Sequence, residues 1–213
     1  MLSSAQFYLS DKNIDEVKKN FELLVHLYFI KLDFNKILKY VNLVGKDNLL
    51  NSILTKKSYD NSNAWTLYRI GEAYNGSGDI LNAYIFYKKS DELSPFNPEF
   101  KNKLGASLMA QKNIPQAIKI FESILVEDPK FVQAINNLGY ANLVSGNPQK
   151  AEELYNRALK LDPDYESLLM NIVGLKIYQK KYKEAEEVLK KVLKKNPKNE
   201  QAIAVLKQLK GLN

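Results

Sequence analysis

The chain has 213 residues, of which 45% are hydrophobic and 26% charged, a composition typical of an ordinary soluble protein. It has no cysteine, which excludes disulfides and thiolate metal sites, and its single histidine leaves no partner set for a metal ion or a catalytic centre. No apolar stretch approaches the roughly 20 residues that a membrane-spanning helix needs. We therefore expect a protein that is not an enzyme, without a cofactor and without a transmembrane segment.

The net charge of +7 is concentrated at one end of the chain. From Lys176 to Asn213 there are 11 Lys and 4 Glu, a difference of +7, whereas the other 175 residues hold 20 basic and 20 acidic groups. A basic end of this kind can attract nucleic acid or anionic lipid. It can equally be the solvated face of the last helices, and the sequence leaves both interpretations open.

Three sets of residues recur every 34 positions. The sets are Gly71, Gly105 and Gly139; Pro95, Pro129, Pro163 and Pro197; and Ala83, Ala117, Ala151 and Ala185. A period of this length is typical of a repeat protein, in which each unit buries its apolar face only against its neighbours.

The first 63 residues follow this pattern loosely. Turns between helices align at Lys12, Gly45, Gly78, Lys112, Gly146 and Lys180. Residues 1–30 are therefore predicted to be the last part of one repeat, and residues 31–63 a degenerate repeat. His26 lies in an apolar run and is interpreted as a structural residue. Because the first helix, Leu2 to Leu9, has no polar cap ahead of it, we expect either a piece of a longer protein or a truncated first unit.

Four clear units follow at residues 64–97, 98–131, 132–165 and 166–199. In the third, apolar residues recur at helical spacing on both sides of a Ser145 to Pro148 break, and Asp162-Pro163 ends the second helix. Each unit is thus predicted to be two antiparallel helices. Gly139 and Ala151 allow close backbone approach.

Large aromatic residues, namely Tyr87, Phe121 and Tyr155, are expected to fill the space between one hairpin and the next. The fourth unit has Val173 where the others have glycine. Residues 200–213 are predicted to be a C-terminal capping helix, with Ile203 and Leu206 covered by the preceding unit and Lys207 in the glycine position.

These residues resemble the tetratricopeptide repeat family. The unit at 64–97 supplies its pattern with Leu67, Ile70-Gly71, Tyr74, Gly78, Ala83, Tyr87 and Pro95. The resemblance implies an all-α fold, a right-handed α-solenoid of antiparallel helical hairpins, whose first helices line a concave groove. It also implies a non-catalytic scaffold for protein–protein interaction that binds a protein or peptide segment.

The resemblance assigns the groove-facing positions to the first helix of each unit. These are Trp65, Tyr68, Arg69, Glu72 and Asn75; Asn102, Lys103, Ala106 and Met109; Asn136, Asn137, Tyr140 and Leu143; and Met170, Asn171, Gly174 and Ile177. Trp65 is more readily explained as a staple against the preceding degenerate repeat than as a ligand contact.

Asparagine amides suit recognition of an extended peptide backbone, and tyrosine adds rigid contact area. Alanine would favour the helix more at Asn102, Asn136 and Asn171. We therefore expect Asn136→Ala with Asn171→Ala to weaken binding and leave the melting temperature nearly unchanged. Capture of a chaperone tail through its terminal carboxylate is disfavoured, because the matching positions lack the required cations and include Glu72.

Three functions remain open at this stage. The first is a non-catalytic interaction module within a larger assembly, and the Lys/Asn/Ile-rich composition favours a bacterial one. The second is a nucleic-acid-binding helical repeat that uses the basic C-terminal end, and the third is an accessory subunit of an enzyme. We expect a cytoplasmic location, or a periplasmic one if the chain is part of an exported protein.

Overall fold

The computed structural model describes residues 64–210, and this part of the chain is entirely helices and short connections. The repeats predicted over residues 1–30 and 31–63, together with His26, lie outside the described residues. The chain divides into two compact units at Phe96 and Asn97. The described part of the first unit is one hairpin, formed by α5 (Ala64–Gly76) and α6 (Ile80–Leu93).

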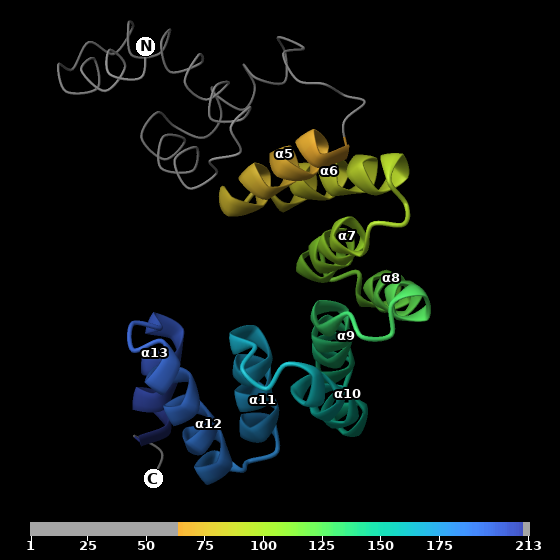
Figure 1. Ribbon diagram of the computed structural model, residues 1–213. Coiled ribbons are helices and arrows are strands. Elements are labelled where there is room, and N and C mark those ends of the chain that lie inside the picture. Colours follow the sequence, from red (N-terminus) through yellow and green to blue (C-terminus); the bar gives the residue numbers. More distant parts are fainter. Residues whose placement is uncertain (1–63, 211–213) are drawn as a thin grey trace, which may run out of the picture. The chain divides into compact units, whose positions relative to one another are not determined.

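The second unit is a succession of hairpins. Its helices are α7 (Pro98–Ala110), α8 (Ile114–Glu127), α9 (Val132–Val144), α10 (Pro148–Leu161), α11 (Glu166–Tyr178), α12 (Tyr182–Lys195) and α13 (Glu200–Lys210) (Figure 1). Each helix packs against the next, and the first helices α7, α9 and α11 also contact one another in order. The predicted all-α solenoid of antiparallel hairpins is thus confirmed for the described residues.

The turn inside each described hairpin has the backbone conformation that its position predicts. Gly78 and Gly146 have φ angles of 83° and 81°, and Lys112 and Lys180 have φ angles of 63° and 59°. A left-handed conformation suits glycine and is unfavourable for lysine. The turn positions are therefore confirmed, and two of the four turns keep the same shape with a residue that disfavours it.

Side-chain caps or proline mark the start of several helices. The Asp79 carboxylate accepts a hydrogen bond from the Asn82 N–H at 3.1 Å, and the Asn97 amide oxygen accepts one from the Glu99 N–H at 2.9 Å. Proline occupies the first turn of α7, α8 and α10, where its missing N–H costs nothing. Helices α9, α11 and α12 begin without either feature.

The glycine column marks the contact between the two helices of one hairpin. A Cβ atom at Gly105 would lie 2.5 Å from the Phe121 ring, and one at Gly71 would lie 2.7 Å from the Tyr87 ring. Gly139 is in the same relation to Tyr155. The glycines are at helix–helix contacts as predicted. The expectation that these rings lie between hairpins is corrected, because each ring packs on the glycine of its own hairpin.

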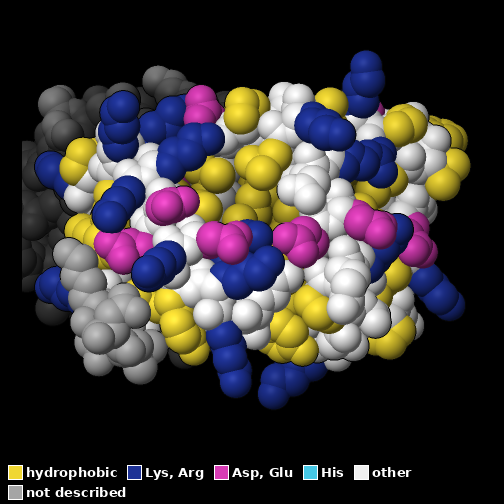
Figure 2. All heavy atoms as spheres, turned by 90° about the horizontal axis from the view of Figure 1, so that it is seen from below, with side chains coloured by type: hydrophobic (Ala, Val, Ile, Leu, Met, Phe, Trp, Pro, Cys, Tyr) yellow, Lys and Arg dark blue, Asp and Glu magenta, His cyan; other side chains and the backbone are white. Residues whose placement is uncertain are grey.

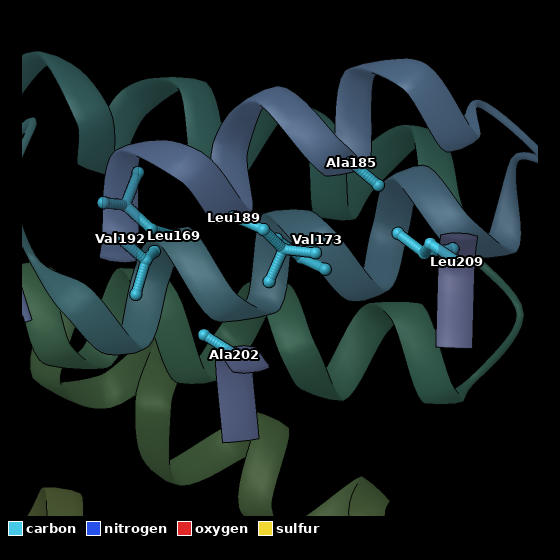
Figure 3. Packing of buried hydrophobic residues seen from close by; sticks show 7 residues of the cluster. All are labelled: Leu169, Val173, Ala185, Leu189, Val192, Ala202 and Leu209. Carbon is cyan, nitrogen blue, oxygen red and sulfur yellow. The ribbon is translucent and has the colours of Figure 1, made fainter. Parts of the chain in front are cut away.

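In the hairpin α11–α12, the equivalent contact between the two helices is made by different residue types. Val173 occupies the glycine position and Leu189, rather than an aromatic ring, faces it (Figure 3). Both side chains are buried with Ala185. A larger residue on one helix is therefore matched by a smaller one on its partner, since the interior is close-packed.

Helix α13 covers the end of this core. Ala202 and Leu209 are buried in the cluster, and Leu206 packs against it partly buried (Figure 3). The predicted capping role is supported, but the buried face is centred on Ala202 and Leu209. Ile203 is only half-buried, so its expected coverage is corrected, while Lys207 is exposed.

Candidate binding face

The predicted groove residues of the first unit form one aromatic and charged cluster on α5. The Trp65 and Tyr68 rings meet edge to face at 5.5 Å, and the Arg69 guanidinium lies 6.0 Å from the Trp65 ring centre. Trp65 stays 45% exposed. The cluster offers two aromatic rings at a steep angle to each other, with one cation beside the Trp65 ring. The predicted staple would involve residues before Ala64, outside the described residues.

Glu72 belongs to the same face and has a specific partner. The Tyr87 hydroxyl, which comes from α6, donates a hydrogen bond to the Glu72 carboxylate. Burial raises the pKa of Tyr87, and the hydrogen bond to Glu72 raises it further. The hydroxyl therefore stays protonated and remains a donor. The buried end of this tyrosine is satisfied by the residue that follows Gly71.

In the second unit, the predicted asparagines bond to one another across repeats. The Asn137 amide donates to the Asn102 oxygen at 2.9 Å, and the Asn171 amide donates to the Asn136 oxygen at 2.9 Å. A weaker contact of 3.4 Å from Asn136 to Asn137 joins the two pairs. We call these four residues the asparagine ladder. It links α7, α9 and α11 through their side chains.

The ladder changes the interpretation of these residues. Asn136 is only 2% exposed, and Asn102 is also buried. Truncating one partner of a buried hydrogen bond typically costs about 1–3 kcal/mol. From this geometry we expect Asn136→Ala with Asn171→Ala to lower the melting temperature rather than leave it nearly unchanged, because much of the amide capacity is used between helices.

The most open part of this face surrounds Tyr140 on α9. The side chain is 43% exposed. The equivalent positions on the neighbouring first helices hold Ala106 on α7 and Gly174 on α11, each 34 residues away. A Cβ atom at Gly174 would meet nothing within 4 Å. An exposed ring is thus flanked by positions with little or no side chain.

Beneath this part of the face lies a buried hydroxyl without a partner. Tyr155 is 1% exposed, and its hydroxyl has no hydrogen-bond partner in the structure. Burial raises the pKa of Tyr155, with a further contribution from Tyr140. From the sequence, Tyr155 was expected only to be a packing residue. The signal that could have revealed more is that the ring position alternates between tyrosine and phenylalanine.

Comparison with known proteins identifies the repeat. Sequence models described as tetratricopeptide repeat match residues 66–97, 102–166 and 142–209. The chain belongs to the tetratricopeptide repeat family. No curated protein sequence matches it.

Solved tetratricopeptide structures share the fold at low sequence identity. A thermophilic tetratricopeptide repeat protein from Thermus thermophilus, TTC0263, is 16% identical with a TM-score of 0.69, over 88% of this chain and 98% of the other. YrrB, described as having an unusual peptide-binding site, is 16% identical with a TM-score of 0.54 over 92% and 98%. The first such domain of Spaghetti (RPAP3), bound to the HSP90 peptide SRMEEVD, is 19% identical with a TM-score of 0.51 over 56% and 95%.

The remaining predicted positions of this tetratricopeptide array are partly covered. Met109, Lys103 and Asn137 are half-buried. Met170 packs against the core that α13 closes, so part of its side chain is used there. Of the predicted set in the second unit, Tyr140 is the one whose side chain is exposed.

Acidic residues offset part of the basic C-terminal end. Lys176 lies 2.8 Å from Glu184 and 3.2 Å from Glu152, and Lys195 lies 2.8 Å from Asp164. The Glu184 bond raises the pKa of Lys176. Figure 2 shows basic side chains intermixed with a row of acidic ones on the face it presents. The described lysines therefore do not form a continuous basic surface on this face.

The described part of the chain also bears on metal binding and membrane insertion. Within residues 64–210, no three His, Cys, Asp or Glu residues gather as a possible metal site. None of the helices in this range combines the length and apolar character needed to cross a bilayer. Tetratricopeptide repeats are typically non-catalytic scaffolds, and they generally act as protein–protein interaction modules.

Proposed function

We propose that this chain binds an extended segment of a partner protein along the first helices of its second unit. The observation that carries the proposal is the exposed Tyr140 ring, held between the small residues Ala106 and Gly174. A rigid aromatic side chain with open space on both sides suits contact with a peptide, because it offers area at low entropic cost. The module is a scaffold within a larger assembly.

The types of side chain on this face favour a peptide ligand over a nucleic acid. Its side chains are mostly amide, aromatic and aliphatic, whereas nucleic-acid binding needs many unpaired cations along the backbone path. Lys191 and Lys195 near the chain end both pair with Asp164. A face with few charges instead suits the uncharged backbone of an extended polypeptide, to which the amide groups not used in the asparagine ladder can bond.

Site-specific photocrosslinking tests the proposal. A photoreactive phenylalanine analogue is placed at Tyr140, and in a matched control at Glu153, an exposed position of the second helix α10. Each full-length protein is irradiated in a native lysate. We expect crosslinked protein partners from position 140 only. Equal capture from both positions, or capture from Glu153 alone, would contradict binding along the first helices.

Nucleic acid is the second outcome that the experiment can return. Fluorescent single-stranded RNA and DNA are titrated with the full chain at several salt concentrations. We expect weak binding with no dependence on Tyr140. Tight binding that falls steeply with salt would favour the basic end instead, because counterion release controls such affinities.

A further inference from the structure

Two positions recur together in each described hairpin, one on each of its helices. One position holds the ring of the second helix, and the other is the residue directly after the glycine column on the first helix. The pairs are Tyr87 with Glu72, Phe121 with Ala106, Tyr155 with Tyr140, and Leu189 with Gly174. A tyrosine hydroxyl at the first position needs a hydrogen-bond acceptor, which the residue at the second position can supply.

Two of the four pairs carry a hydroxyl, and one of these two meets the demand within the chain. The Tyr87 hydroxyl donates to the Glu72 carboxylate. Phe121 and Leu189 have no polar atom and need no partner. Tyr155 alone ends in a buried hydroxyl that donates to nothing in the described structure. A buried polar group without a hydrogen bond is costly, so its presence requires an explanation such as a ligand or an ordered water.

The position of this hydroxyl points to the first-helix face. The Tyr155 ring lies against Gly139, as the Tyr87 ring lies against Gly71, and Tyr87 extends from there to the next residue of the first helix. In the α9–α10 hairpin that next residue is Tyr140. By this analogy the Tyr155 hydroxyl is directed toward Tyr140, and Tyr140 is close enough to contribute to the raised pKa of Tyr155.

We propose that the Tyr155 hydroxyl donates a hydrogen bond to a backbone carbonyl of an extended peptide lying across Tyr140 and over Gly174. The inference rests on the proposed function and names its anchoring contact. A carbonyl is the acceptor because an extended chain presents one at every residue without bringing a charge to the buried hydroxyl. Gly174 leaves the room that the peptide needs.

The probe for this inference is a displayed library of random, unstructured peptides selected on the full-length chain. Affinities of selected peptides are then measured for the wild type, Tyr155→Phe and Gly174→Leu. Tyr155→Phe removes only the oxygen and should weaken binding about three- to tenfold, the worth of one hydrogen bond. Gly174→Leu should weaken binding more than tenfold by filling the open space. Tyr182→Phe on α12 is the matched control and should bind as the wild type does.

An ester scan of the selected peptide identifies the acceptor. Replacing backbone amides by esters one at a time weakens one carbonyl at a time. We expect one ester to reduce binding to the wild type and to cause no further loss with Tyr155→Phe, since the bond is already absent there. A scan in which no ester couples to Tyr155 would overturn the carbonyl assignment.

The outcomes separate this inference from the proposed function. Loss of binding with Gly174→Leu but not with Tyr155→Phe means that the face binds peptide and that the hydroxyl bonds water instead, which overturns the inference alone. If the selected peptides bind Tyr155→Phe and Gly174→Leu as tightly as the wild type, the inference and the proposed function are both overturned. A library that yields no binder has the same consequence. Thermal melting of each variant checks that Tyr155→Phe and Gly174→Leu remain folded.

Discussion

The hairpins α9–α10 and α11–α12 pack their two helices with different residue pairs at equivalent positions. In the first, Gly139 receives the Tyr155 ring, and in the second, Val173 faces Leu189. Neither residue of a pair is required alone. What is kept is the combined volume between the helices, as expected for a close-packed interior. The pair is therefore the unit that specifies this contact, and a glycine matters only opposite a ring.

Replacing one member of a pair should have the largest effect. Gly139→Leu places a side chain where the Tyr155 ring already lies, so we expect a loss of about 1–3 kcal/mol in the free energy of unfolding. Chemical denaturation of the full chain measures it. Gly174→Leu is the matched control, because open space surrounds Gly174, and it should leave stability unchanged or slightly raised. A Gly139→Leu variant that unfolds like the wild type would refute the pair model.

Exchanging the whole pair should restore much of that stability. Gly139→Val alone overpacks the contact and Tyr155→Leu alone leaves it underfilled, so each should cost about 1–3 kcal/mol. Together they reproduce the Val173 and Leu189 pair of the next hairpin. We expect the double variant to lose less than the sum of the single losses, by about 1–2 kcal/mol, as coupled neighbours do. Strictly additive losses in a double-mutant cycle would show that the positions do not compensate.

The 34-residue period predicted those structural features that a single residue determines. The turn positions at Lys112 and Lys180 follow from alignment with Gly78 and Gly146, and all four have a left-handed backbone. The ends of α6, α8, α10 and α12 follow from the repeated prolines, each of which comes directly after the C-terminal capping residue of the helix. Such features are local, because the chain must turn wherever the period places a break.

Structural features that depend on a contact between two residues could not be predicted from the 34-residue period. The asparagine ladder joins Asn137 to Asn102 and Asn171 to Asn136, residues 35 apart rather than 34, so no single column contains both partners. The missing partner of Tyr155 is likewise a property of a pair. The buried face of α13 was also misassigned, since Ala202 and Leu209 rather than Ile203 are its centre. Neighbouring residues lie about 100° apart around a helix, and the pattern of one short helix did not fix which of Ala202 and Ile203 faces the core.

The asparagine ladder provides the next test. Asn136→Ala removes a buried amide and leaves the Asn171 amide without its acceptor, so we expect a loss of about 1–3 kcal/mol. Asn171→Ala should cost less, because Asn171 is half-buried and water can reach its surroundings. Urea denaturation of the two variants ranks them. Equal stability of both variants and the wild type would return the asparagines to a role in binding alone.

The smallest expected effect compares the turns of the same two hairpins. Gly146 and Lys180 occupy the same left-handed position, with φ angles of 81° and 59°. Glycine adopts this conformation without strain, whereas a side chain is disfavoured in it. Lys180→Gly should therefore raise the free energy of unfolding by about 0.5–1 kcal/mol, less the entropy that glycine adds to the unfolded chain. The reverse change, Gly146→Lys, should lower it by a similar amount. Denaturation curves of the two variants and the wild type measure both changes. A Lys180→Gly variant less stable than the wild type would mean that the Lys180 side chain makes a contact that stabilises the fold by more than its backbone strain costs.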